Sequence, residues 1–311
     1  MRNRVQNRQS DNGAVATRHG SQRDLLEILW HMGYNSDIWR QCGEALSSMV
    51  DLRYLSWTQA AGSVNSDGAF LKAASEDKSL FYKISAYNSS QGIYGHEAVN
   101  ECIAYRVSQE FGFPVPPTDL VRALVRIDGE EYETHVAVSE TFKTAQDTRV
   151  AFEEFFKACR ENGESVLAVA LRFGWQTQVH QLFLFDFLIY NRDRHGANLE
   201  VLEAGGMKRL SPFFDNGLSF AVSCSTDKEL AAFDVMADRR VNNFIGSRSL
   251  YENLKLVTEP VAAKELSESA RDRLFYGMGG VLSESHQEVV WNMLWGRWNY
   301  AKEVCDLRPS D

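Results

Sequence analysis

One stretch, residues 189–201 with the sequence I-Y-N-R-D-R-H-G-A-N-L-E-V, constrains the fold of this chain more than any other. It follows residues 182–189, which are apolar on nearly every face and therefore typical of a buried helix. Four charged or ionisable residues, at positions 192–195, stand at the end of this apolar support. A rigid element that presents a polar loop is a common way to position chemistry, so we expect a functional site here.

The spacing within and beyond this stretch favours phosphoryl transfer. Asp193 and Asn198 are five positions apart, as in the D-x-x-x-x-N catalytic loop of kinases, where the Asp orients and deprotonates the acceptor hydroxyl. Asp215 follows in S-P-F-F-D-N-G, where kinases have D-F-G. Because Mg²⁺ is hard and small it prefers oxygen ligands, which Asn198 and Asp215 supply. The alternative is an Asp- and Asn-rich turn between two strands, which D-x-x-x-x-N alone would not exclude.

The fuller pattern is more specific. The string N-x-D-R-H-x-x-N at residues 191–198, followed by S-P-F-F-D at 211–215, resembles the HipA-like serine/threonine kinases. It is most similar to the compact, CtkA-type members, which lack the extra amino-terminal subdomain of HipA. The D-R-H-x-x-N string also resembles the phosphatidylinositol 3- and 4-kinases, which have a distantly related fold. The resemblance spans roughly residues 56–300 and is strongest at these two loops.

This resemblance implies an α+β, two-lobed, protein-kinase-like fold with a small antiparallel-sheet lobe and a larger helical lobe. ATP and Mg²⁺ would be the cofactors. Asp193 would be the catalytic carboxylate, and the acceptor would be a serine or threonine of an unidentified protein or of the chain itself. A bacterial, phage-associated or effector kinase is implied, with an antitoxin-type regulator as a candidate partner. A lipid or small-molecule kinase and a non-catalytic nucleotide-binding regulator are the alternatives.

The predicted elements divide the chain into four parts. We expect a mobile, Arg-containing tail at 1–22, a helical segment at 23–55, a small nucleotide-binding lobe at 56–143 and a helical catalytic lobe at 144–311. The second helix of the helical segment is expected to reach Met49. Acidic side chains in that segment leave no basic face for reading DNA, so a helical pair packed on the main body is favoured over a helix-turn-helix.

A small polar turn at residues 61–68 precedes two candidate strands, at 70–73 and 80–84. Backbone N–H groups in such a turn can cradle phosphates, although G-x-G-x-x-G is absent and a plain hairpin turn is the alternative. The candidate nucleotide-binding residues of this turn are Gly62, Ser63, Ser66 and Gly68. The resemblance further implies that Ser63 or Ser66 is an autophosphorylation site, because HipA-like kinases phosphorylate a serine of their own phosphate loop.

Lys83 lies inside an apolar strand, where a lysine is either a solubility device of an edge strand or a buried cation with a partner. The kinase interpretation makes it the lysine that contacts the nucleotide phosphates, and such a lysine needs a glutamate from a nearby helix. The helix predicted to begin near His96 offers Glu97 and Glu101, one turn apart. The pattern of the family favours Glu101; Glu97 and a solvated helix face are the alternatives.

The remaining elements follow from local signals. Residues 120–127 and 132–138 flank Asp-Gly, which predicts an antiparallel hairpin, and residues 139–142 are then the hinge expected to meet an adenine. Beyond residue 144 the pattern is helical, with helices expected near 152–159 and 166–171. Residues 241–246 are polar and loop-like, and no chemistry is assigned to them. The Trp-rich stretch Trp291, Leu294, Trp295 and Trp298 is expected in the core.

Composition excludes several other classes. The net charge of -9 disfavours general binding of nucleic acid or of an anionic membrane. The five cysteines are scattered without a C-x-x-C pair, which argues against a disulfide framework or a zinc site and favours a reducing compartment. Neither a membrane-spanning apolar run nor a signal peptide is recognisable. We therefore expect a cytoplasmic protein, or one delivered as an effector, without membrane association.

Overall fold

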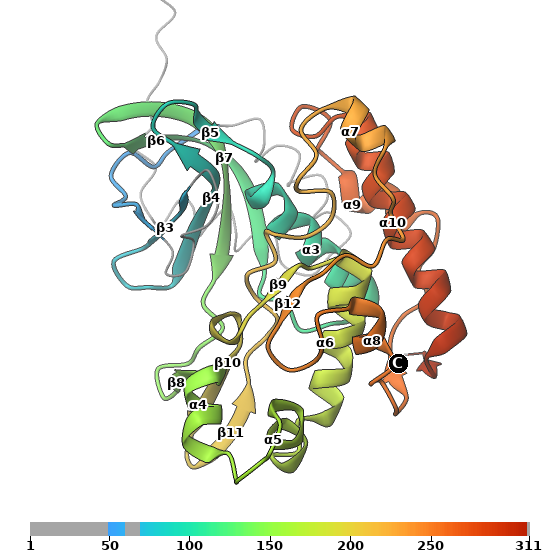
Figure 1. Ribbon diagram of the computed structural model, residues 1–311. Coiled ribbons are helices and arrows are strands. Elements are labelled where there is room, and N and C mark those ends of the chain that lie inside the picture. The colour runs from blue at the N-terminus through green and yellow to red at the C-terminus, as the bar shows by residue number, and fades with distance from the viewer. Residues whose placement is uncertain (1–48, 60–68, 310–311) are drawn as a thin grey trace, which may run out of the picture.

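The computed structural model describes residues 49–59 and 69–309 of the chain. The predicted tail, residues 23–48 of the predicted helical segment, and residues 60–68, which include the predicted phosphate turn, lie outside this range. The described residues form an α+β fold in which a large sheet stands beside a helix-rich part (Figure 1). No helix among them is both long and apolar enough to cross a membrane.

The large sheet has seven strands in the order β1-β6-β7-β4-β3-β2, with β5 attached to β4. Its strands are β1 (Met49–Asp51), β2 (Thr58–Gln59), β3 (Ala69–Ala74), β4 (Leu80–Asn88), β5 (Gly92–Tyr94), β6 (Thr118–Ile127) and β7 (Glu130–Glu140). All neighbours pair antiparallel except β1, which pairs in parallel with β6. The β6–β7 turn has positive φ at both Asp128 and Gly129, which confirms the hairpin that Asp-Gly predicts.

The prediction that the helical segment extends to residue 55 is wrong at its end, where the chain forms strand β1. Met49, expected in a helix, begins β1 and pairs with Arg122 of β6. Without β1, this edge of β6 would present unpaired N–H and C=O groups. A strand at residues 49–51 forms hydrogen bonds with these groups, which a helix end could not do. The sheet therefore begins at residue 49 rather than at 56.

The two faces of the sheet are buried differently. Helix α3 (Glu97–Phe111) packs against one face, contacting β4, β6 and β7, and ends at Gly112 with a left-handed φ of 81° (Figure 1). A separate apolar cluster covers the other face and includes Leu80, Tyr82 and Ile84 of β4. Since side chains alternate along a strand, Lys83 points away from this cluster and toward the side of α3.

The helix-rich part is organised around α6 (Gln176–Ile189), which is buried from Leu182 to Ile189 and contacts α8 and α10. The predicted helices in this region are confirmed as α4, α5 and α6. The remaining elements are β8 (Thr148–Ala151), α4 (Phe152–Cys159), α5 (Val166–Arg172), β9 (Asp193–Arg194), the 3₁₀ turn η1 (Gly196–Asn198), β10 (Glu200–Ala204), β11 (Met207–Leu210), α7 (Asp227–Ala231), β12 (Asn242–Asn243), α8 (Leu250–Leu254), β13 (Val261–Ala262), α9 (Ala270–Phe275), α10 (Glu284–Val304) and β14 (Leu307–Arg308).

This part is less purely helical than predicted. Strand β8 falls where the helical pattern was expected to begin, and it pairs with β10, which also pairs with β11. The side chains of β8 are mostly exposed, so no apolar alternation marks it in the sequence.

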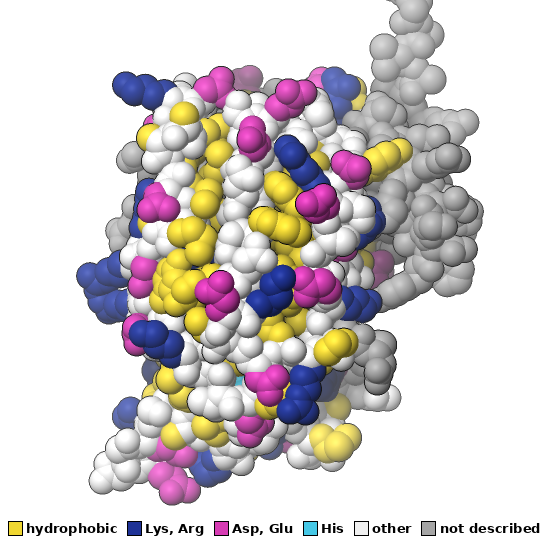
Figure 2. Space-filling view, turned by 90° about the vertical axis from the view of Figure 1, so that its right-hand side faces the viewer, with side chains coloured by type: hydrophobic (Ala, Val, Ile, Leu, Met, Phe, Trp, Pro, Cys, Tyr) yellow, Lys and Arg dark blue, Asp and Glu magenta, His cyan; other side chains and the backbone are white. Residues whose placement is uncertain are grey.

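Leu294 and Trp298 of α10 are buried as expected, whereas Trp291 and Trp295 are only partly covered. On this side of the molecule Figure 2 shows apolar side chains interspersed with charged ones.

Candidate active site

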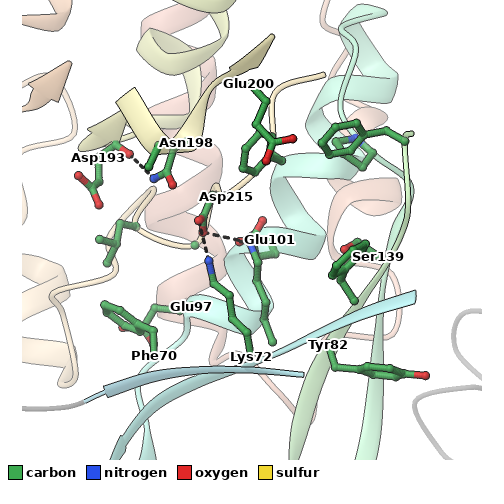
Figure 3. Close-up of a pocket in the computed structure, with 18 of the residues that line it drawn as sticks. Phe70, Lys72, Tyr82, Glu97, Glu101, Ser139, Asp193, Asn198, Glu200 and Asp215 are labelled. Atoms are coloured by element: carbon green, nitrogen blue, oxygen red, sulfur yellow. Dashed lines mark hydrogen bonds and ion pairs between the residues drawn. The ribbon is translucent and has the colours of Figure 1, made fainter. Parts of the chain in front are cut away.

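A cavity of about 660 Å³ is lined by residues of both the sheet and the helix-rich part. It brings together every predicted catalytic and metal-binding residue, which are Lys83, Glu101, Asp193, Asn198 and Asp215. Figure 3 shows Asp215 in the middle of this group, with Asp193 and Asn198 to one side and Glu101 to the other. The predicted phosphate-turn residues Gly62, Ser63, Ser66 and Gly68 lie outside the described residues.

Lys83 is held by two carboxylates at once. Its Nζ donates to Glu101 Oε1 at 2.5 Å and to Asp215 Oδ1 at 3.0 Å. Burial alone would lower the pKa of Lys83, but the facing carboxylates of Asp215 and Glu101 outweigh it and raise that pKa. Glu97 instead accepts a hydrogen bond from the backbone N of Ala86, and burial raises its pKa. The predicted contact of Lys83 with Glu101 is thus confirmed, and Glu97 is not the partner.

Asp215 also forms an ion pair with a second lysine, Lys72, which was not predicted from the sequence. Its Oδ2 accepts a hydrogen bond from Lys72 Nζ at 2.8 Å, and Lys72 stands directly opposite Lys83 in the β3–β4 ladder. Burial would raise the pKa of Asp215, but Lys83 and Lys72 hold it far below its usual range. The backbone of Asp215 is left-handed, with φ of 62°. A Cβ at the nearby Gly217 would lie only 3.2 Å from the backbone O of Glu97, so glycine lets this loop approach α3 closely.

Asp193 is fixed by neutral groups. Helix α6 ends in a left-handed Tyr190, and the Asn191 side chain then accepts from the backbone N of Asp193 at 3.0 Å. Asn198 Nδ2 donates to the backbone O of Asp193 at 2.8 Å. Asn242 Nδ2 donates to Asp193 Oδ1 at 2.9 Å, because β12 pairs in parallel with β9. Residues 241–246, to which no chemistry was assigned from the sequence, therefore include a side chain that contacts the candidate catalytic carboxylate.

A buried arginine joins the two loops of the motif. Arg194 forms an ion pair of 2.8 Å with Asp186 of α6, and each side chain is only 1% exposed. Burial raises the pKa of Asp186, and Arg194 opposes that shift. The same guanidinium donates to the backbone O of Phe214 at 2.5 Å and to Asn216 Oδ1 at 2.7 Å, on either side of Asp215. Arg194 thereby sets the position of Asp215 relative to Asp193.

Two stacked aromatic side chains also line the cavity. Phe142, at the predicted hinge, stacks on Phe214 with ring centroids 5.5 Å apart. Glu200 also lines the cavity, and its Oε1 accepts from Arg149 at 2.9 Å. Its Oε2 is buried and has no hydrogen-bond partner within the described ranges. The cavity thus combines apolar and charged side chains, which is typical of a ligand-binding site.

Residues 59–273 match the family model of the HipA-like C-terminal domain. The chain belongs to this family. The resemblance expected from the two loops is therefore confirmed. No curated protein matches the chain.

Two solved structures are similar to this HipA-like chain. The Helicobacter pylori proinflammatory kinase CtkA is 17% identical, with a TM-score of 0.50, and the match covers 82% of this chain and 98% of CtkA. The HipA of Shewanella oneidensis, solved with HipB and operator DNA, is 14% identical with a TM-score of 0.40, and the match covers 92% of this chain and 85% of HipA. At this identity the likeness to CtkA shows a shared fold.

The oxygen donors of the HipA-like cavity fit a magnesium ion that would take its other ligands from phosphates and water. No group of three or more His, Cys, Asp or Glu side chains that could hold a metal occurs within residues 49–59 and 69–309. Asp215 offers carboxylate oxygens, and Asn198 offers its amide oxygen because its amide nitrogen already binds Asp193. Mg²⁺ usually takes one or two protein ligands and completes its shell with water and substrate phosphates, so two such residues suffice.

Proposed function

We propose that this protein is an ATP-dependent serine/threonine protein kinase of the HipA-like type, which transfers the γ-phosphate to a protein hydroxyl and also to itself. The observation that carries the proposal is the single cavity that gathers Asp193, Asn198, Asp215 and the Lys83–Glu101 pair. In this proposal the sheet, with α3, is the small lobe, and the chain from about residue 144 onward is the large lobe.

Each group has a role that its position supports. Asn198 and Asp215 would hold Mg²⁺, which would neutralise charge on the nucleotide phosphates. Lys83 would orient those phosphates, and Glu101 would keep its ammonium directed into the cavity. Phe142 and Phe214 would contact the adenine. With these roles, the γ-phosphate would lie near Asp193.

Asp193 would act on the acceptor. As the serine or threonine oxygen forms its bond to the γ-phosphorus, the bond from that phosphorus to the bridging oxygen breaks and ADP leaves. The hydroxyl proton passes to the Asp193 carboxylate. Asn242 donates a hydrogen bond to Oδ1, while Oδ2 accepts none in the described part of the chain and lies 3.7 Å from His195 Nε2. Oδ2 is thus the oxygen that would take the proton.

The test is transfer of labelled phosphate from ATP. We expect label in protein, on serine or threonine, after incubation with a cell lysate and mass spectrometry of the products. Asp193→Asn removes the charge but keeps the shape, so it should lower the transfer rate by about 10² to 10⁴ while ATP affinity, measured by calorimetry, stays within about twofold. Near wild-type transfer by Asp193→Asn would show that the assigned base is wrong.

The same assay separates the alternatives. A lipid or small-molecule kinase would place the label in an organic extract, and a non-catalytic nucleotide-binding regulator would bind ATP without any transfer. Autophosphorylation at Ser63 or Ser66 stays a prediction, which phosphopeptide mapping can check. An antitoxin-type regulator also stays a prediction, since it depends on family membership and not on any surface of this chain.

A further inference from the structure

Two lysines face each other across adjacent strands in the cavity. Lys72 of β3 and Lys83 of β4 are direct partners, next to a register shift between Phe70 and Lys72. Their neighbours Leu71 and Tyr82 belong to the apolar cluster on the opposite face, so both lysines point into the cavity. Like charges directly opposite in a sheet are destabilising, unless an anion lies between them. Asp215 is that anion (Figure 3).

The two lysines are held unequally. Lys83 is 19% exposed and contacts both Glu101 and Asp215. Lys72 is 37% exposed, and Asp215 is the only hydrogen-bond partner of its ammonium in the described part of the chain. A long, flexible lysine with one ion pair at the cavity surface can change partners at small cost. If Lys83 moved away, the buried carboxylate of Glu101 would lose its counter-ion, which is costly.

Lys72 and a metal ion compete for the same atom. Both oxygens of Asp215 are taken, Oδ1 by Lys83 and Oδ2 by Lys72. The two lysines balance the charges of Glu101 and Asp215, so a bare divalent cation would enter a cluster that is already neutral and would displace the Lys72 ammonium from its hydrogen-bond partner. A nucleotide supplies another anionic partner, because its phosphates can accept Lys72 as the metal takes Oδ2.

We propose that Lys72 is a second phosphate-binding lysine, which occupies the metal-binding oxygen of Asp215 until a nucleoside triphosphate draws it away. This inference rests on the proposed function. Its consequence is that metal binding and nucleotide binding are coupled: the cation is retained only together with the triphosphate. Lys72, which lies outside the predicted motif, thus controls when Asp215 can bind the metal ion.

The first test measures metal binding without nucleotide. Mn²⁺, which takes the same oxygen ligands as Mg²⁺, is titrated into the full chain and its free fraction is read by electron paramagnetic resonance. Lys72→Met should bind Mn²⁺ roughly tenfold or more tightly than wild type, because it frees Oδ2 and removes a positive charge. Lys72→Arg keeps the charge and should behave as wild type. Lys143→Met removes another cavity lysine that does not contact Asp215, and should change the affinity by less than about twofold.

The second test measures nucleotide binding with metal present. Lys72→Met should bind ATP about tenfold more weakly, since one charged contact to phosphate is lost. Equal Mn²⁺ affinity in Lys72→Met and wild type would overturn the inference, and so would an equal gain in Lys143→Met, which would reflect overall charge. Failure of the proposed function shows differently, as absence of ATP binding or of phosphate transfer in the wild-type protein.

Discussion

The Asp193 loop and the Lys83 cluster lie in one cavity but are held by different forces. Asp193 is fixed by hydrogen bonds to the neutral side chains of Asn191, Asn198 and Asn242, all within the helix-rich part. The Lys83 cluster instead joins β3, β4, α3 and the Asp215 loop through ion pairs. Neutral hydrogen bonds hold one geometry whatever the charge of the ligand, whereas ion pairs exchange partners when a charged ligand enters.

This difference suits the two tasks. A carboxylate that accepts a proton works best when it is oriented before the substrate arrives, and the neutral network provides that orientation. A site that receives a metal and a triphosphate must change its charge balance, and the lysine cluster provides charges that can be redistributed. The first region therefore predicts sensitivity to shape, and the second predicts sensitivity to charge.

Helix α3 carries Glu101 of the second region, and two of its side chains anchor it to backbone outside the sheet. Asn100 Nδ2 donates to the backbone O of Gly217 and of Ser219, and Arg106 donates to the backbone O of Leu274 and of Tyr276. Glu101 therefore keeps its position relative to Asp215. Lys72 and Lys83 are the members of the cluster that come from the sheet, so a shift of the sheet relative to α3 would change the Lys83–Glu101 distance.

The largest effect should come from breaking the buried Arg194–Asp186 ion pair, which lies beneath the neutral hydrogen bonds of the Asp193 loop and ties that loop to α6. Arg194→Met leaves the buried carboxylate of Asp186 without a counter-ion, with only the hydrogen bond from Asn191, and should lower the free energy of unfolding by about 3–5 kcal/mol. Urea denaturation measures this. Arg149→Met is the control, because Arg149 is 57% exposed in its pair with Glu200 and should cost less than about 1 kcal/mol. A loss below about 1 kcal/mol for Arg194→Met would mean that the buried pair does not support the loop.

A smaller effect should come from the charge region. Glu101→Gln removes the carboxylate that holds Lys83, and we expect kcat/KM for ATP-dependent transfer to fall about 100-fold, as for one strong charged contact. Glu97→Gln is the matched control one turn earlier, and its amide oxygen can still accept from the backbone of Ala86. Equal losses in the two variants would show that the distinction between these glutamates has no functional meaning.

The sequence revealed the parts of this site that depend on local spacing. Asp193, Asn198 and Asp215 lie in two short loops that a motif marks. Periodicity placed Glu97 and Glu101 on one helix, and only the pattern of the family favoured Glu101. Lys72 was missed because its place opposite Lys83 depends on strand register, which the register shift at Phe70 alters. Asn242 was missed because its contact spans 49 residues of sequence and no motif marks it. Asp186, a lone carboxylate in an apolar helix, was a signal that could have been followed to Arg194.

The smallest effect separates orientation from charge at Asp193 itself. Asn242→Ala removes one hydrogen bond to Oδ1, so we expect kcat to fall about tenfold with little change in ATP affinity. Asn242→Asp keeps the size but places a second carboxylate beside the first. Two carboxylates in contact raise the pKa of one of them, so Asp193 would hold its proton to higher pH, and the rate should recover as the pH rises. A merely structural asparagine would give two variants with the same loss and the same pH profile. Recovery at higher pH in Asn242→Asp alone would show that Asn242 acts through the Asp193 carboxylate.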